Sequence, residues 1–225
     1  MKNLILSFVM FGSFACLGSN VLAEEYANEV VDENEGGNAD FNHMYFGFGI
    51  GFTLDKDSAK RIDTGANKSK NVNNFLGALY FGSGRVMNSA PVYLAGELGL
   101  DFSKTNRNSL NLNGTDVKFN HNGLSPSAGF RVGCVNGSSL FFLKLALSYV
   151  RVNMKCTEHD SDFSMSIAKL APTIGIGAEK MLGKKYSTRI DLEYICKTKK
   201  TGPLYEPERK GAIRAKISLI YNASF

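Results

Sequence analysis

The 225-residue sequence contains no tryptophan, three histidines and four cysteines. The few cysteines and histidines limit the disulfides and metal sites that the protein could form. Cys16 lies in an N-terminal apolar segment, and the three other cysteines are an odd number, which excludes a complete disulfide framework. We expect Cys134, Cys156 and Cys196 to act as small apolar residues. The histidines and cysteines show no metal-ligand spacing, and no glycine-rich loop precedes a helix, so the sequence predicts neither a metal nor a cofactor.

Long apolar runs are missing beyond the N-terminus. There, Lys2 is followed by an apolar run over 4–17 and by small residues before Glu24, which is the layout of a cleaved signal peptide. Further on, the most apolar stretch, 140–150, is interrupted by Lys144 and is shorter than the roughly 18 residues of a membrane helix. We therefore predict a signal peptide over 1–23 and no transmembrane helix after it.

Acidic residues are concentrated in one short segment. Residues 24–40 contain seven acidic and no basic residues, whereas residues 41–225 contain 25 Lys and Arg against 14 Asp and Glu. An acidic segment of low hydrophobicity is typical of a flexible leader. The basic excess forms no single stripe or patch, so the sequence predicts no nucleic-acid partner. The expected organisation is a signal peptide (1–23), an acidic flexible leader (24–41) and one domain (42–225).

From residue 42 onward the dominant feature is a period of two, which is the period of a strand. In 43–54 the even positions are large and apolar, and the odd positions are mostly small. The same alternation recurs around 73–82, 91–103, 123–135, 140–150, 168–179, 187–198 and 215–225. The links between these segments cover roughly 55–72, 83–90, 104–121, 135–138, 153–162, 181–186 and 199–210.

Long polar links tend to alternate with short turns along this series. This asymmetry is typical of a membrane barrel whose turns lie on one side and whose loops lie on the other. The predicted fold class is all-β: an eight-stranded antiparallel up-and-down transmembrane β-barrel with short periplasmic turns and longer extracellular loops.

The second face of the segments is rich in Gly, Ser, Ala and Thr and carries isolated charges of both signs. A soluble lipocalin-like barrel would instead place many Lys and Glu residues outward. An eight-stranded barrel is just wide enough for side chains to fill it, and buried charges persist only when they are paired or hydrated. We therefore predict a luminal ion-pair network without an open channel, made of Glu97, Asp101, Glu179, Asp191 and Glu193 with Arg131, Lys144, Lys169, Arg189, Lys197, Arg214 and Lys216.

The final segment, "ISLIYNASF" (217–225), resembles the C-terminal signal of bacterial outer-membrane β-barrel proteins. The segments "SPSAGFRVG", "APTIGIGAE" and "STRIDLEYI" are similar to strands of the small OmpA-type barrels and of rickettsial-type surface antigens. The resemblance implies localisation in the outer membrane, contact with its lipid and lipopolysaccharide, and recognition by the barrel assembly machinery. It implies an assembly signal at Phe225, Tyr221, Leu219 and Ile217. The candidates for an interfacial aromatic belt are Tyr149, Tyr194, Tyr221, Phe102 and Phe225.

The function expected from these observations is non-enzymatic. The protein would act as a surface antigen or adhesin that binds a host or surface ligand through its loops, or as a structural element of the membrane. Two alternatives stay open. A lipid A-modifying enzyme is one, because His159-Asp160-Ser161 resembles the His-x-Ser of barrel deacylases, and a soluble periplasmic lipid-binding barrel is the other. We expect His43 and His121 to be polar residues at strand boundaries.

Overall fold

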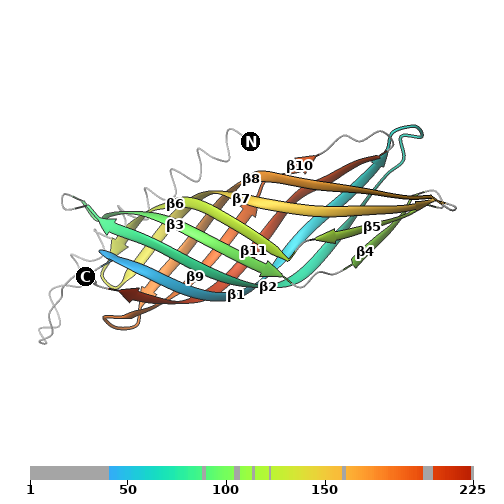
Figure 1. The fold of residues 1–225 in the computed structure, drawn as a ribbon. Helices are drawn as coiled ribbons and strands as arrows, with labels where there is room; N and C mark the ends of the chain where they lie inside the picture. The colour runs from blue at the N-terminus through green and yellow to red at the C-terminus, as the bar shows by residue number, and fades with distance from the viewer. Residues whose placement is uncertain are drawn as a thin grey trace, which may run out of the picture.

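The structure is a computed structural model that describes residues 41–87, 90–103, 107–112, 115–121, 123–158, 161–199 and 205–223. The predicted signal peptide and nearly all of the predicted leader lie outside these residues, as does Phe225. Figure 1 shows an elongated barrel of tilted strands. In the described part of the chain, no helix is long and apolar enough to cross a membrane.

Within the residues that the structure describes, eleven strands form one antiparallel sheet, and eight of them close it into a barrel. Each barrel strand pairs with the next one along the chain, and the first pairs with the last, so the barrel is closed. The predicted eight-stranded antiparallel up-and-down barrel is confirmed. Its strands are β1 (His43–Arg61), β2 (Asn67–Val86), β3 (Val92–Ser103), β6 (Leu124–Asn136), β7 (Ser139–Glu158), β8 (Ser161–Met181), β9 (Tyr186–Ile195) and β11 (Tyr205–Ala223).

Short connections follow β2, β6 and β8 at one end of the barrel, which we call the turn end. The connection between β6 and β7 consists of residues 137–138, and Gly137 has a φ of 57°. This left-handed conformation is accessible to glycine without a steric penalty, so the sequence "NGSS" forms the tight turn that was expected.

The opposite end is built from strands where the sequence predicted loops (Figure 1). β1 and β2 continue to a turn at 62–66, and β7 and β8 pair as far as Glu158 and Ser161. A hairpin of β4 (Arg107–Leu112) and β5 (Thr115–His121) adds to the edge of β7, and β10 (Thr198–Lys199) pairs with β11. We call this part of the sheet the extension. The predicted loops 55–72, 104–121, 153–162 and 199–210 are therefore wrong over most of their described residues.

The side chains of the barrel reverse their polarity along its length. Next to the turn end, large apolar side chains point outward, for example over 44–54 on β1 and 141–149 on β7, and we call this zone the belt. In the extension the apolar side chains point inward instead and form a buried core. This core contains Ala59, Val117, Phe119, Val150, Val152, Met154, Cys156, Ala171, Ile195 and Ala212.

An irregularity in the β1–β11 ladder marks the boundary between belt and extension. The register shifts between Asp55 and Asp57 of β1, opposite Gly211 of β11. Gly211 has a φ of 122°, which L side chains rarely adopt, and a β-carbon there would meet the Tyr194 hydroxyl at 2.6 Å. Such irregularities bend a strand and increase its twist, so this glycine lets β11 change direction as it leaves the belt.

Candidate functional site

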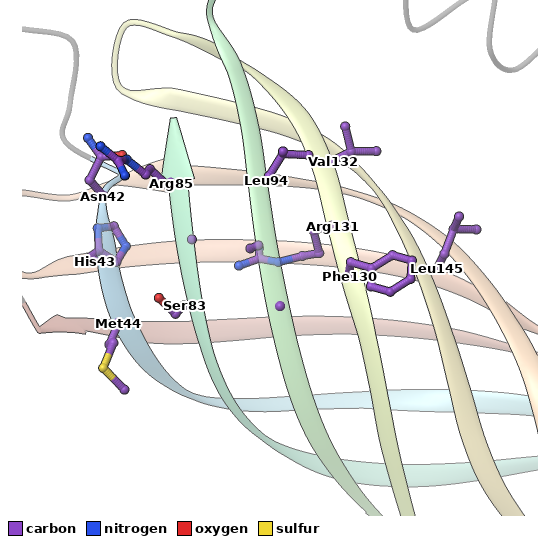
Figure 2. A pocket seen from close by; sticks show the side chains of 13 residues that line it. Asn42, His43, Met44, Ser83, Arg85, Leu94, Phe130, Arg131, Val132 and Leu145 are labelled. Atoms are coloured by element: carbon purple, nitrogen blue, oxygen red, sulfur yellow. The ribbon is translucent and has the colours of Figure 1, made fainter. Parts of the chain in front are cut away.

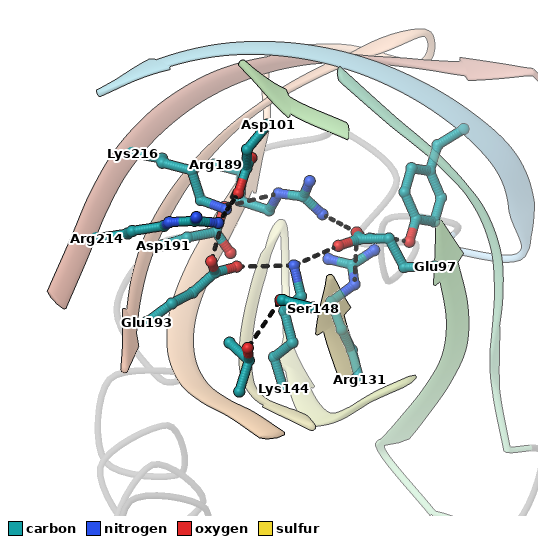
Figure 3. A network of polar contacts seen from close by, with 12 residues as sticks. Glu97, Asp101, Arg131, Lys144, Ser148, Arg189, Asp191, Glu193, Arg214 and Lys216 are labelled. Atoms are coloured by element: carbon teal, nitrogen blue, oxygen red, sulfur yellow. Dashed lines mark hydrogen bonds and ion pairs between the residues drawn. The ribbon is translucent and has the colours of Figure 1, made fainter. Parts of the chain in front are cut away.

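Among the described residues, the lumen of the belt contains a network of ten buried charged side chains, each no more than 7% exposed, and Figure 3 labels all of them except Glu179. Five are acidic and five are basic, so the cluster is neutral when all of them are ionised. Strand alternation places them, because they occupy inward positions that alternate with outward residues, most of which are apolar. The ten residues are Glu97, Asp101, Glu179, Asp191, Glu193, Arg131, Lys144, Arg189, Arg214 and Lys216.

Glu97 on β3 is the centre of this network. Its carboxylate lies 2.8 Å from the Lys144 Nζ, 2.7 Å from a terminal nitrogen of Arg189 and 3.4 Å from the Arg131 Nε. The Tyr45 hydroxyl also donates a hydrogen bond to it over 2.9 Å. One carboxylate therefore connects side chains from β1, β6, β7 and β9 across the lumen.

Glu193 on β9 forms the second junction. Its two carboxylate oxygens accept hydrogen bonds of 2.7 Å from Lys144 and of 2.7 Å from Lys216. Lys216 also lies 3.6 Å from Asp101, which is paired with Arg214. Lys144 thus joins Glu193 to Glu97, and the two junctions form one continuous network.

Two further carboxylates complete the pairing toward the turn end. Glu179 accepts a 3.0 Å hydrogen bond from Arg131 and a 2.6 Å hydrogen bond from the Ser187 hydroxyl. Asp191 lies 3.2 Å from the Arg189 Nε. Burial of a charge costs several kcal/mol unless partners compensate it, so these ion pairs offset the cost of burying the charged side chains in the lumen.

Luminal tyrosines form a second set of partners that the sequence analysis missed. The Tyr80 ring centroid lies 4.3 Å from the Arg189 guanidinium carbon and 5.2 Å from the Lys216 Nζ. Arg131 lies 4.7 Å from the Tyr45 ring and 5.5 Å from the Tyr93 ring. These distances are typical of cation–π contacts. The sequence did contain a signal for them, because these tyrosines occupy the same alternate positions as the small residues that face the lumen.

Glycines opposite these rings give them room. A β-carbon at Gly82 would lie 2.2 Å from the Tyr45 hydroxyl and 2.6 Å from the Gly96 carbonyl oxygen. A β-carbon at Gly84 would lie 2.0 Å from the Tyr93 hydroxyl. The small residues of the inner face are thus required by the aromatic side chains that fill the lumen.

Two predicted members of the network are not in it. Lys169 on β8 and Lys197 are both exposed, and they lie near the junction of belt and extension. Each has the same odd numbering as the inward residues of its segment. At their distance from the turn end, however, the interior is filled by the apolar core of the extension. Their predicted luminal place was therefore wrong.

The described residues of the predicted assembly signal lie on the outer wall. Ile217, Leu219 and Tyr221 of β11 point outward and are 53%, 54% and 43% exposed. They stand opposite Ile50, Phe48 and Phe46 of β1, at the seam that closes the barrel. Tyr221 also contacts Tyr186, with ring centroids 5.6 Å apart, so two tyrosines mark the turn end of the belt. At the other margin of the belt stand Phe102, Tyr149 and Tyr194.

The candidate catalytic residues are only partly described. His159 and Asp160 lie outside the described residues, and Ser161 is the first residue of β8. His43 is buried and packs between Phe41 and Tyr45, at ring-centroid distances of 6.2 and 6.4 Å. His121 is the last residue of β5. Within the described ranges, no group of three or more His, Cys, Asp or Glu residues has the geometry of a metal site.

No protein family and no curated protein matches the sequence. Among solved structures, the chain is similar to neisserial surface protein A, with 12% identity over 80% of this chain and 97% of that one and a TM-score of 0.48. It is also similar to Ail, the attachment invasion locus protein of Yersinia pestis, in complex with the heparin analogue sucrose octasulfate (15% identity, 80% and 99% coverage, TM-score 0.40). A third similar structure is the outer membrane protease OmpT from Escherichia coli (8% identity, 81% and 97% coverage, TM-score 0.42). At these identities and TM-scores the three proteins say nothing about what this chain binds or does.

Proposed function

We propose that this chain is an integral outer-membrane β-barrel protein without enzymatic activity. Its belt spans the membrane, and its extension stands outside the cell as the part that meets host or surface ligands. The turn end faces the periplasm. In this arrangement the luminal charges stabilise the wall of the barrel, and the extension carries the recognition surface of an antigen or adhesin.

The observation that carries the proposal is the reversal of polarity at one level of the barrel. On β1 the outward residues change from Phe52 and Leu54 to Lys56, and on β7 they change from Leu147 and Tyr149 to Arg151. The outward apolar zone covers the about 9 to 11 residues that a tilted strand needs to cross the hydrocarbon layer. An outer wall that is apolar up to this level and polar beyond it matches a barrel with one part in lipid and one in water.

The experiment tests both location and orientation. An epitope tag is inserted at Gly65 in the β1–β2 turn of the extension, and, as a matched control, at Gly183 in the β8–β9 turn of the turn end. Both glycines are exposed, and a β-carbon would contact nothing within 4 Å at either position. We expect antibody to label intact cells with the tag at Gly65 only, and both tags after the cells are permeabilised. A protein that is extracted without detergent would support a soluble barrel and refute the proposal, and labelling of the Gly183 tag on intact cells would refute the orientation.

The proposed assembly signal is tested separately. Removal of Phe225 is expected to lower the amount of protein in the outer membrane, because the assembly machinery is proposed to bind this residue together with Tyr221. The control is Tyr186→Phe, which keeps an aromatic ring beside Tyr221. Unchanged outer-membrane levels without Phe225 would refute this role.

The lipid A deacylase alternative makes an opposite prediction. It requires Ser161 as the nucleophile, so Ser161→Ala would abolish a change in lipid A that the unmodified chain produces. We expect identical lipid A profiles in cells with the unmodified chain, in cells with the variant and in cells without the protein. A difference that depends on Ser161 would establish the enzyme and refute the non-enzymatic function.

A further inference from the structure

The outer wall of the belt carries a groove of about 780 Å³ near the turn end (Figure 2). It follows one row of directly paired outward residues across five neighbouring strands, from β1 through β2, β3 and β6 to β7. The row consists of Met44, Ser83, Gly96, Phe130 and Leu145.

Two small residues in the middle of this row make the groove. Ser83 and Gly96 stand where neighbouring rows have large side chains, such as Phe81 and Leu98 in the row nearer the middle of the belt. A β-carbon at Gly96 would have no atom within 4 Å, so this glycine is not required by a close contact inside the barrel. The gap in the wall is therefore open on its outer side and bordered by Met44 and Phe130.

Among the described lining residues, Arg85 is the exposed cation at the margin of the groove. Arg85 points outward in the next row toward the turn end, where it stands opposite Leu94. The other lining arginine, Arg131, lies behind the wall and is paired with Glu97 and Glu179. Among the described residues that line the groove none is acidic, so this part of its margin is positive and its walls are mainly apolar.

We propose that this groove is a binding site for an anionic phospholipid of the periplasmic leaflet. An acyl chain occupies the gap over Ser83 and Gly96, and the guanidinium of Arg85 binds the phosphate through charge-assisted hydrogen bonds. Charge complementarity favours this occupant over a second copy of the chain, which would bring another Arg85 to the same margin. The inference rests on the proposed function, because it places the turn end on the periplasmic side of a membrane.

The test measures lipid bound to the purified full chain in detergent by native mass spectrometry. Phosphatidylglycerol and phosphatidylcholine with the same acyl chains are titrated in parallel, so that only the charge of the headgroup differs. Arg85→Gln removes the cation, and Gly96→Leu places an apolar side chain in the gap, where a β-carbon would have no atom within 4 Å. The matched control is Arg151→Gln, which removes an exposed arginine from the outer face of the extension.

We expect the unmodified chain to bind phosphatidylglycerol more tightly than phosphatidylcholine. Arg85→Gln should weaken phosphatidylglycerol binding about five- to tenfold, which corresponds to about 1 to 1.4 kcal/mol, and should weaken phosphatidylcholine binding less, because the choline cation already neutralises the phosphate of that lipid. Gly96→Leu should weaken both lipids, and Arg151→Gln neither. Gel mobility with and without heating is measured for each variant, and a response to heating equal to that of the unmodified chain shows that the variant is folded.

Three outcomes would overturn the proposal. They are equal affinity for the two lipids, equal effects of Arg85→Gln and Arg151→Gln, and a monomer–dimer shift in the groove variants in place of lipid loss. Displacement of phosphatidylglycerol by millimolar inorganic phosphate would reduce the site to an anion site and would also overturn it. Failure of the proposed function is distinguishable, since the protein would then remain in solution without detergent.

Discussion

Along β7, the belt has Lys144 inward and Leu145 outward, whereas the extension has Val152 inward and Arg151 outward. The same strand, with an uninterrupted hydrogen-bond ladder to β8, thus passes through two opposite cross-sections. In the belt the barrel has a charged lumen and an apolar outer wall. In the extension it has an apolar interior and a polar outer wall. The backbone is equally satisfied in both, because ladder hydrogen bonds do not depend on side-chain polarity.

The difference shows that the surroundings of the wall select the side chains on each face. In the belt the outer face is proposed to meet lipid, so most large hydrophobic residues lie there, and the lumen is filled by ion pairs, by tyrosines and by small apolar clusters such as the one around Leu140 and Phe142. In the extension the outer face is polar and is proposed to meet water, so an apolar interior can supply the hydrophobic stabilisation that soluble barrels use. The two regions should therefore respond differently to the same kind of substitution.

The largest expected effect comes from removing charge at the centre of the belt lumen. Glu97→Gln keeps the size of the side chain but leaves Arg131, Lys144 and Arg189 with one carboxylate fewer. The loss of one partner from a buried ion pair typically costs about 3–5 kcal/mol. We expect this decrease in the free energy of unfolding, measured by urea titration in lipid vesicles.

The double variant Glu97→Gln with Lys144→Met provides the control for this prediction. It restores the equal number of buried positive and negative charges, so it should recover part of the lost stability. Asp116→Asn on the exposed face of the extension should change stability very little. If the double variant is as unstable as Glu97→Gln alone, charge balance is not what stabilises the lumen.

In the interior of the extension, the corresponding substitution is Phe119→Ala. Phe119 is 1% exposed and stands opposite Met154 in the apolar core. Truncation of a buried Phe costs about 3–5 kcal/mol, but the β4–β5 hairpin can open locally without breaking the barrel. We expect faster hydrogen exchange in β4 and β5, with an unchanged heat-dependent gel shift. Loss of the gel shift would show that the extension and the belt unfold as one unit.

The outer walls are compared by placing arginine on each. Ile50→Arg in the middle of the belt should cost about 2–4 kcal/mol in a lipid bilayer, the range known for arginine at the midplane of membrane barrels. Ser69→Arg on the exposed face of the extension should stay within about 0.5 kcal/mol of the unmodified chain. Unfolding titrations in vesicles measure both values. Equal effects at the two positions would contradict a membrane boundary between them.

The same comparison explains what the sequence could predict. The belt strands were recognisable because Phe46, Phe48 and Ile50 alternate with small residues, and this pattern arises wherever one face meets an apolar medium. In the extension, strands continue through Lys56 and Lys60, where the outward residues are polar and the pattern resembles a loop. The backbone hydrogen bonds that hold these segments together do not affect the hydropathy pattern of the sequence.

The sequence predicted which residues of the candidate site point inward, but it did not predict how far along the barrel axis each of them lies. Parity placed Glu97, Lys144 and Arg189 in the lumen, and the structure brings them together. Lys169 has the same parity on its strand but lies beyond the network, because its level depends on the stagger between strands and on irregularities such as the one at Asp55 and Asp57. Stagger is fixed by pairing among distant segments, which a single sequence does not display.

The smallest expected effect is at the tip of the extension, where charges meet water. The Arg61 Nε donates hydrogen bonds of 2.9 and 3.1 Å to the Asp63 carboxylate, and these hydrogen bonds lower the pKa of Asp63 below its ordinary value of 3.8. A lowered pKa in the folded state means that the pair stabilises the turn above the unfolded pKa, and that this contribution disappears as the pH falls through the folded pKa.

We expect an NMR titration of the Asp63 carboxyl carbon to show the lowered midpoint and Arg61→Gln to raise it. Because the pair is exposed, its effect on stability should be far smaller than that of Glu97, and salt should weaken it. A midpoint that does not respond to Arg61→Gln would show that the pair does not form in solution.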